Sequence, residues 1–377
     1  MGQDFGDLLE LIVESAKSSP SGDNAQPCLF QIENNRILIF HDERRAHHSL
    51  NRQNHASCLA LGALIEAMKI AGTAYGFEAQ FELIFENKKK DLSLWAIVAF
   101  FRSHTKRDPL SLVMSERCTD RRLYHGGSVE DAVFRQIRDL GLASKHCQLH
   151  IQGRHTIQFI NYFTHTESFL WKNQKIVKDL IHWMRLSKSE CEQNQDGMSW
   201  KNVGLNSVEA LFLRLVRSFP VLPKLIWDLG FKFKIRSDAK KSIVSSAGLI
   251  CFTAKNLDPE SLCQAGQLAY RVWLMLNANG YGVQPLSFSS SSIGDLVSGS
   301  LSIETSEKER RHFARGLEIF QAHFNLKANE IPVWMFRTGK SSPLLESCRT
   351  PRRSFEEICR RKIHVVAPSR QHEKTLN

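Results

Sequence analysis

The stretch SSPSGDNAQP, at residues 18–27, decides how the rest of this sequence is interpreted. It lies between a segment with apolar residues at helical spacing and a short apolar segment, which predict a helix and a strand. Ser21, Asn24 and Gln26 supply hydrogen-bond donors and acceptors that suit the edge of a flat heterocycle. The alternative is an ordinary helix-to-strand turn, because Pro, Ser, Gly and Asn favour turns for conformational reasons alone.

The length and composition predict a large globular protein. A chain of 377 residues is long enough for two domains or two fused lobes. Hydrophobic residues make up 42% and charged residues 24%, which is ordinary for a soluble chain. No apolar run approaches the roughly 20 residues that cross a bilayer, and the acidic N-terminal residues are not typical of a signal peptide. We therefore expect a cytoplasmic protein with no membrane partner.

Cysteines and charge exclude several classes of function. The nine cysteines are spread singly and form no C-x-x-C pair, so we expect neither a zinc site nor a disulfide framework, and no other metal. The net charge is +11, and residues 340–377, with nine Lys/Arg and four Asp/Glu, supply +5 of it. No helix-turn-helix, RNP or zinc-finger pattern accompanies this charge. We therefore expect anionic small molecules as ligands, and no nucleic acid.

The first half of the chain predicts an α+β lobe. Four alternating apolar segments are typical of strands, at 28–33, 36–42, 77–85 and 93–101. Asn34 and Asn35 separate the first two and suit a two-residue hairpin turn. Residues 55–72 are apolar on nearly every side, which predicts a helix buried in the core.

The second half, from about Pro109, repeats parts of this order. Strands are expected at 147–152, 247–254 and 331–337, helices at 110–116, 129–140, 154–184, 259–279 and 306–324, and a serine-rich loop at 288–299. The helix at 259–279 is followed by a glycine and a strand, as is the helix at 55–72. We interpret this parallel as an internal duplication.

The opening stretch resembles a loop of a known family. Its pattern, A/S-x-x-P-S-x-x-N-x-Q-P after an amphipathic helix, is similar to the flavin-contacting loop of the nitroreductases, which are FMN-dependent oxidoreductases. In that family the loop reaches the flavin from the partner half of a dimer. The resemblance implies that Pro20, Ser21, Gly22, Asn24 and Gln26 contact FMN.

A basic cluster resembles the phosphate site of the same family. The string RCTDRRLY begins at Arg117 and resembles the R-R-T-N-R-x-x-F signature that opens the nitroreductase core. The resemblance gives the phosphate-binding places to Arg117, Thr119 and Arg121. Cys118 and Asp120 depart from the pattern. Without the resemblance, such a cluster is typical of a solvated helix end.

Two later motifs follow in the order that the family has. The sequence after the helix at 259–279 resembles the family's strand beneath the isoalloxazine ring, which implies contacts from Gln284, Pro285 and Leu286. The C-terminal RTPRRSFEE resembles the family's closing R-x-P-R-R-P-x-E-E, in which the paired arginines complete the phosphate site. Arg352 and Arg353 occupy those places.

An insertion resembles one branch of the family, the fused two-lobe proteins of the Acg or MoeY type. It has Trp183 and Arg185, then Asp-Gly at 196–197, then Gly204. In that branch the insertion covers the flavin as a lid. We therefore expect a lid at about 183–235, with Trp183, Arg185 and Trp200 near the ring face. From composition alone, residues 187–206 are a polar loop.

These features predict an α+β, nitroreductase-like fold in which two fused lobes each pack a central helix on a mainly antiparallel sheet. The predicted division is 1–107 for the first half, 108–361 for the second half with its lid, and 362–377 for a flexible tail. The chain would form a pseudo-dimer that binds one FMN. It would be a monomer or a weak homodimer.

The resemblance implies an oxidoreductase that passes a hydride from NAD(P)H through FMN to an unidentified small-molecule acceptor. No catalytic side chain is assigned, because flavin chemistry belongs to the cofactor. The absence of G-x-G-x-x-G and Walker motifs disfavours a Rossmann domain and a P-loop ATPase. Two alternatives stay open: a flavin-binding or sequestering protein with little turnover, and an accessory factor in a cofactor or modified-peptide pathway.

Overall fold

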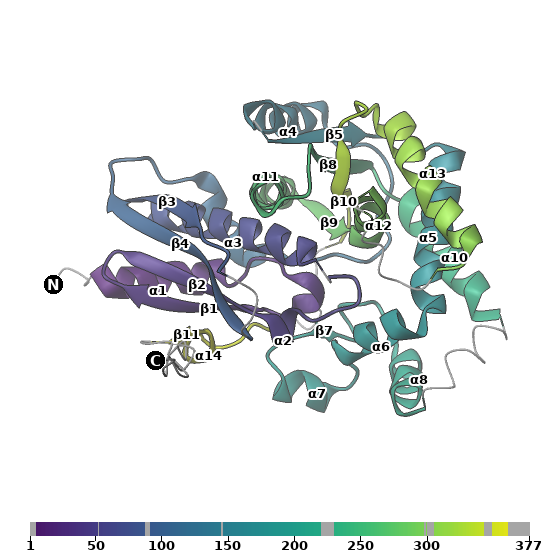
Figure 1. Cartoon of the computed structure of the whole chain (residues 1–377), viewed down its shortest axis with the longest axis horizontal. Helices are drawn as coiled ribbons and strands as arrows, with labels where there is room; N and C mark the ends of the chain where they lie inside the picture. Colours follow the sequence, from purple (N-terminus) through teal and green to yellow (C-terminus); the bar gives the residue numbers. More distant parts are fainter. Residues whose placement is uncertain are drawn as a thin grey trace, which may run out of the picture.

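Two sheets, each packed on its own long helix, form the body of the molecule (Figure 1). The computed structural model describes residues 5–360, apart from 52, 87–90, 145, 220–229, 298, 300–304 and 343–348. The predicted flexible tail, 362–377, therefore lies outside the described residues, as does part of the predicted lid. The fold is α+β, as the sequence predicts.

The first lobe is built on a five-stranded sheet with the order β11-β1-β2-β4-β3. Its strands are β1 Cys28–Glu33, β2 Arg36–Asp42, β3 Phe77–Leu83, β4 Leu92–Arg102 and β11 Cys359–Arg360. The predicted hairpin is confirmed, with Asn34 at a φ of 53° in the turn. β11 comes from the C-terminal segment and pairs with β1 in parallel, whereas the other neighbours are antiparallel. The helix α1, Phe5–Ala16, packs on this lobe.

The second lobe is built on a four-stranded antiparallel sheet with the order β5-β8-β10-β9. Its strands are β5 Cys147–Gln152, β8 Gly248–Ala254, β9 Tyr281–Pro285 and β10 Ile331–Lys340. Every residue of β8 is buried, as its continuous apolar sequence predicts. The order β5-β8-β10-β9 matches β1-β2-β4-β3 strand for strand, so the two lobes have the same topology.

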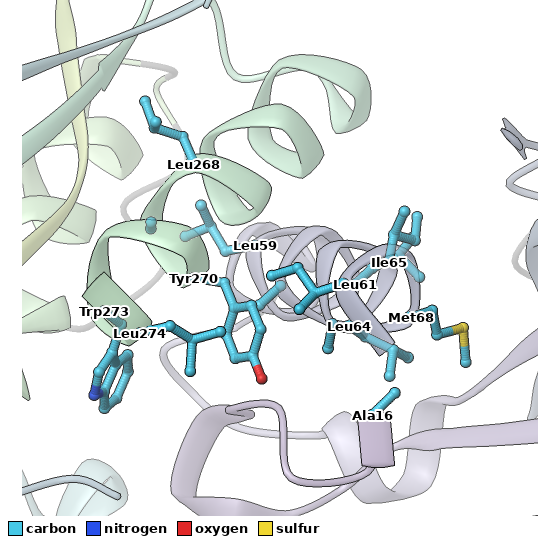
Figure 2. Packing of buried hydrophobic residues seen from close by; sticks show 14 of the residues in the cluster. Ala16, Leu59, Leu61, Leu64, Ile65, Met68, Leu268, Tyr270, Trp273 and Leu274 are labelled. Atoms are coloured by element: carbon cyan, nitrogen blue, oxygen red, sulfur yellow. The ribbon is translucent and has the colours of Figure 1, made fainter. Parts of the chain in front are cut away.

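The two lobes meet where α3, His55–Ala74, crosses α11, Pro259–Ala278. Both helices have 20 residues, and Figure 2 shows their apolar side chains interleaved. The backbones approach closely because glycine lies at the crossing on each side. A Cβ atom at Gly62 would overlap the Cys263 carbonyl, and one at Gly266 would overlap the Leu59 carbonyl. The crossing therefore requires glycine at both positions.

A buried ion pair adds a polar connection between these helices. Arg271 on α11 contacts Glu66 on α3 over 2.6 Å and Asp108 over 2.7 Å. Among the described helices, α3 alone has the length and apolar composition of a membrane span, but 83% of that window is buried inside the fold. α3 is therefore the core helix that the sequence predicts.

A long insertion separates β5 from β8. It contains α5 Ile157–Lys172, α6 Gln174–His182, β6 Met184–Arg185, α7 Lys188–Gln193, β7 Met198–Ser199, α8 Ser207–Ser218 and α10 Lys232–Val244. α6 and α8 share a small apolar core, on which Trp200 packs. The polar stretch at 187–206 thus contains a helix and a short strand as well as loops.

The remaining elements confirm some predictions and correct others. They are η1 Gly22–Asn24, α2 Glu43–Ala46, η2 Pro109–Leu112, η3 Met114–Glu116, α4 Asp131–Ala143, α12 Ser287–Val297, α13 Glu307–Phe324 and α14 Phe355–Ile358. The helix expected at 306–324 is confirmed as α13, which begins with a capping box of Ser306 and Glu309. The helix expected at 110–116 is instead two short 3-10 turns.

The serine-rich loop expected at 288–299 is wrong, because most of it forms α12. The Ser290 and Ser291 hydroxyls donate to the carbonyls three residues earlier, over 3.0 and 3.4 Å, and so are satisfied within the helix. Ser289 and Ser290 are fully buried. Tertiary packing therefore overrides the turn preference of serine at this position.

Candidate functional site

The loop from α1 to β1 holds three non-glycine residues in the left-handed region of backbone space. Asp23, Asn24 and Gln26 have φ values of 48°, 57° and 50°. Such conformations cost of order 1–3 kcal/mol each and persist only where the surroundings hold them. The Gln26 backbone amide donates to the Ser21 hydroxyl over 3.0 Å, and the turn η1 closes the loop. The polar stretch is therefore a strained loop of defined shape.

Two distant segments clamp this loop through its side-chain amides. Asn24 Nδ2 donates to the carbonyls of Gly197 and Pro351, each over 2.9 Å. Gln26 Oε1 accepts from the Arg353 backbone amide over 2.9 Å. Gln26 Nε2 donates to the Gln195 carbonyl, which also belongs to the insertion, over 3.0 Å. Asn24 Oδ1 is buried without a hydrogen-bond partner in the described part of the chain. The amides predicted to contact a ligand are thus engaged with the insertion and the C-terminal segment.

Two arginines meet beside the start of the loop. Arg117, which is 7% exposed, donates from Nε to the Ser18 carbonyl over 3.0 Å. Arg352 donates from Nη2 to the same carbonyl over 3.2 Å. Both Nη1 atoms are buried and lack a hydrogen-bond partner among the described residues. The two side chains, which the sequence predicts for the phosphate site, thus lie together at the Ser18 carbonyl.

The surroundings of this pair disfavour its positive charge. Burial lowers the pKa of Arg117. Burial, and then the charge of Arg117, lowers the pKa of Arg352 to about 9. Arg117 lies 4.6 Å from the ring of Trp273, and burial raises the pKa of the neighbouring Tyr270, whose hydroxyl points toward the N-terminal segment that carries Ala16 (Figure 2). Two neighbouring guanidiniums with buried, unused Nη1 donors form an arrangement that a bound anion stabilises.

The other members of the predicted arginine cluster lie against the insertion. Arg121 donates to the side-chain oxygen of Asn202 and, over 3.3 Å, to the sulfur of Met198. Asn202 in turn donates to the Thr119 carbonyl over 3.3 Å. The predicted cluster is thus divided, since its first arginine meets the C-terminal segment and its last meets the insertion.

Gln284 on β9 is held by an arginine that the sequence analysis did not single out. Arg337 on β10 is completely buried and donates to Gln284 Oε1 over 2.6 Å and to the Arg122 carbonyl over 2.7 Å. Its guanidinium lies 4.3 Å from the ring of Tyr124. These contacts join β9 to the basic segment. A charged residue inside the apolar run of the last strand was the signal that could have identified Arg337.

The remaining predicted residues shape the surroundings of the site. Pro285 ends β9 opposite Phe336, and Leu286 packs in a second apolar core. Pro20 lines a small cavity of about 40 Å³ beside the loop. Gly22 begins η1.

An ionic contact connects the insertion to the loop. Asp196 accepts from Arg45 Nη2 over 2.5 Å and also from Arg185. Arg45 donates from Nε to the Ala25 carbonyl over 2.8 Å. The two guanidiniums lie 5.5 and 5.8 Å from the ring of Trp183. Burial opposes ionisation of Asp196, but the two arginines hold its pKa below the usual value.

We call this contact the latch: Arg45, Arg185 and Asp196. Neither Arg45 nor the role of Asp196 is predicted from the sequence. The basic run at 44–45 and the Asp-Gly pair were signals, but neither indicates its partner. Among the described residues, no three His, Cys, Asp or Glu side chains are grouped to hold a metal ion.

Comparisons with known proteins give only remote similarities. No family model matches the chain, and no curated protein is similar to it in sequence. Among solved structures, it is similar to the FMN-dependent nitroreductase NfnB of Mycobacterium smegmatis in complex with NADPH, at 9% identity and a TM-score of 0.37, over 66% of this chain and 95% of that one.

Two further solved structures give comparable values. An FMN-dependent nitroreductase of Clostridium difficile R20291 is 9% identical, with a TM-score of 0.35 over 69% of this chain and 98% of that one. The FMN- and NADPH-dependent nitroreductase NfnB of Sphigopyxis sp. strain HMH is 12% identical, with a TM-score of 0.33 over 67% and 97%. At these values no residue role is transferred, and the candidate site rests on its own contacts.

Proposed function

We propose that this chain binds FMN and acts as an oxidoreductase of the nitroreductase type. The observation that carries the proposal is the pair Arg117 and Arg352, whose buried Nη1 atoms have no partner in the described part of the chain. An anion with several oxygen acceptors would satisfy both donors and reduce the repulsion between the two guanidiniums. The terminal phosphate of FMN has that charge and those acceptors.

The strained loop suits the ring of the same ligand. The Asn24 and Gln26 side chains stand on a backbone of defined shape, and although their other amide atoms are already bonded, the buried Asn24 Oδ1 is an acceptor with no donor among the described residues. The imide edge of a flavin offers both a donor and acceptors. Because the arginine pair contacts Ser18 at the start of the loop and the amides lie near its end, one segment serves both parts of the ligand.

FMN, when bound, supplies the redox chemistry, which takes a hydride from NAD(P)H and passes electrons to a small-molecule acceptor that is not identified. The residues of the chain bind the phosphate, orient the ring and control access. The latch holds the insertion against the loop, which limits the entry of water and of large reactants.

A second candidate function, flavin binding with little turnover, is favoured by that same insertion. The side-chain amides of Asn24 and Gln26 are bonded to it, so a nicotinamide donor reaches the loop only after these bonds break. The third possibility that the sequence left open, an accessory role in a cofactor or modified-peptide pathway, has no separate structural observation in its favour.

The proposal includes one FMN per chain, in a pseudo-dimer of the fused Acg or MoeY type. The matching strand orders and the paired glycines at the helix crossing support an internal interface in place of one between subunits. The chain would then act as a monomer or a weak homodimer in the cytoplasm.

FMN titration followed by anaerobic reduction tests both candidates. Purified protein, freed of flavin, is titrated with FMN while flavin fluorescence is recorded. We expect Arg352→Ala to weaken binding by about 1.5–3 kcal/mol, roughly tenfold to a hundredfold. Arg135→Ala, on the exposed face of α4, is the matched control and leaves affinity unchanged.

The outcomes separate the candidates. Reduction of the bound FMN by NADH or NADPH in stopped-flow mixing supports the enzyme, whereas tight binding with negligible reduction supports sequestration. If neither FMN nor FAD binds at micromolar concentration, the whole proposal fails.

A further inference from the structure

The outer face of the insertion carries an apolar stripe that the described residues leave exposed. On α8, at the lower edge of the molecule in Figure 1, Val208, Leu211 and Leu215 are 76%, 55% and 48% exposed. Phe219, at the end of the helix, is 60% exposed. Steps of three and four residues place Val208, Leu211 and Leu215 on one side of the helix, and Phe219 follows as its C-cap residue. A different side of α8, which includes Leu213, packs in the core that it shares with α6.

α10 carries a further exposed apolar residue, and an ion pair connects this helix to α8. Lys234 of α10 pairs with Glu209 of α8 over 3.4 Å, which brings the starts of the two helices together. Phe233 is 66% exposed, and the Lys232 ammonium lies 5.3 Å from its ring. Single exposed apolar residues are normal on a protein surface, but a group at regular helical spacing indicates an interaction site. We call this group the apolar patch: Val208, Leu211, Leu215, Phe219 and Phe233.

The sequence segment that carries the apolar patch has an excess of basic residues. Residues 201–241 contain nine Lys/Arg and three Asp/Glu, a net charge of +6. Residues 340–377 contribute +5, so these two segments account for the whole net charge of +11. Exposed apolar side chains flanked by Lys and Arg are the composition of helices that lie in the interface of an anionic membrane.

We propose that the apolar patch binds the surface of an anionic lipid bilayer. The basic side chains would contact the headgroups, while the apolar ones enter the boundary between headgroups and acyl chains. A second copy of this chain is a weaker candidate, because it would bring two segments of net charge +6 together. An acidic protein would satisfy the charge but would also need a matching apolar surface. This inference is independent of the proposed function and revises the expectation of no membrane partner.

Cosedimentation of the full-length protein with vesicles tests the proposal. Vesicles of phosphatidylcholine mixed with phosphatidylglycerol should bind the protein at low salt, and added salt should weaken binding because it screens the charges. Vesicles of phosphatidylcholine alone should bind it at least tenfold less. Leu211→Glu with Leu215→Glu should reduce binding to the anionic vesicles at least tenfold. Leu142→Glu, at a residue of α4 that is 80% exposed, is the matched control and should have no effect.

Four results would overturn the proposal. They are no binding to anionic vesicles at low salt, an equal loss with Leu142→Glu, self-association that the double variant abolishes, and a large fall in the unfolding temperature of the double variant. That last result would show that the patch is covered within the chain. Leu211→Ser, a milder change, should still weaken vesicle binding severalfold with unchanged stability.

Discussion

In the first lobe, Asn34 and Asn35 alone separate β1 from β2, whereas in the second lobe residues 153–247 separate β5 from β8. The opposite holds for the loop before the first strand, which covers residues 17–27 in the first lobe but only 144–146 in the second. The two lobes share the same order of four strands. They therefore differ in the segments added between those strands and not in the core. The candidate site lies where the long loop of one lobe meets the long insertion of the other.

This difference explains why we expect one site per chain and not two. A duplicated frame has two equivalent places beside the helix crossing. The long loop and the long insertion each occur once, and they meet at Asn24 and Gly197. The three residues at 144–146 offer no counterpart to the amide-bearing loop. Flavin-to-protein stoichiometry near two would contradict this interpretation.

The largest loss of stability is expected at the crossing of α3 and α11, where the two lobes are most alike. Gly62→Ala and Gly266→Ala should each destabilise the protein by about 4 kcal/mol or more, because the new Cβ meets the backbone of the other helix. Urea unfolding monitored by circular dichroism measures the effect. Gly22→Ala, whose Cβ meets no atom within 4 Å, is the control. Tolerance of one substitution but not the other would show that the crossing is not equivalent on its two sides.

The next largest effect is on FMN affinity. It concerns Arg117 and Arg121, to which the sequence resemblance gives the same phosphate-binding role. Arg117→Ala should weaken FMN binding by about 1.5–3 kcal/mol, since a charge-assisted bond to phosphate is lost. Arg121→Ala should weaken it less, because Arg121 is engaged with Asn202 and Met198. Isothermal titration with FMN provides both values. A larger effect for Arg121 would move the phosphate site toward the insertion.

A smaller effect is expected from opening the latch. Asp196→Asn removes the charge that attracts Arg45 and Arg185, a change of about 1 kcal/mol for partly exposed pairs. Reduction of bound FMN should become roughly fivefold faster, with FMN affinity nearly unchanged. Stopped-flow mixing with NADPH measures the rate. Glu192→Gln, on the exposed side of α7, serves as control, and equal rates in all three proteins would exclude gating by the insertion.

The smallest effect at neutral pH is on the unfolding temperature, and it involves His323 of the second lobe. Burial, and then the charge of His155, lowers the pKa of His323 to about 4. The unfolded chain therefore binds more protons than the folded one between about pH 6.5 and 4, and stability is lost as the pH falls through that window. His323→Phe should leave the unfolding temperature nearly unchanged at pH 7 and reduce its fall at pH 4.5. A parallel pH dependence in both proteins would assign acid instability to other groups.

Local patterns in the sequence were sufficient for much of the frame. The Asn34-Asn35 turn, the strand β8 and the long helix α11 are all as predicted, and Asp258 caps α11 by accepting from the Ser261 backbone amide over 2.7 Å. Each depends on residues within one or two turns of chain, so short-range periodicity and capping chemistry determine it. The helix α12 could not be predicted in this way, because its serines are helical only once they are buried.

Through its resemblance to nitroreductase motifs, the sequence also predicted that Arg117, Arg352, Asn24 and Gln26 belong to one candidate site. Only the tertiary structure decided how these groups are bonded, because their partners lie far away in the chain. Arg117 meets Ser18 across 99 positions, and Asn24 meets Gly197 across 173. A residue type shows what a group can donate or accept, but the fold selects which distant group satisfies it and which donors stay open for a ligand.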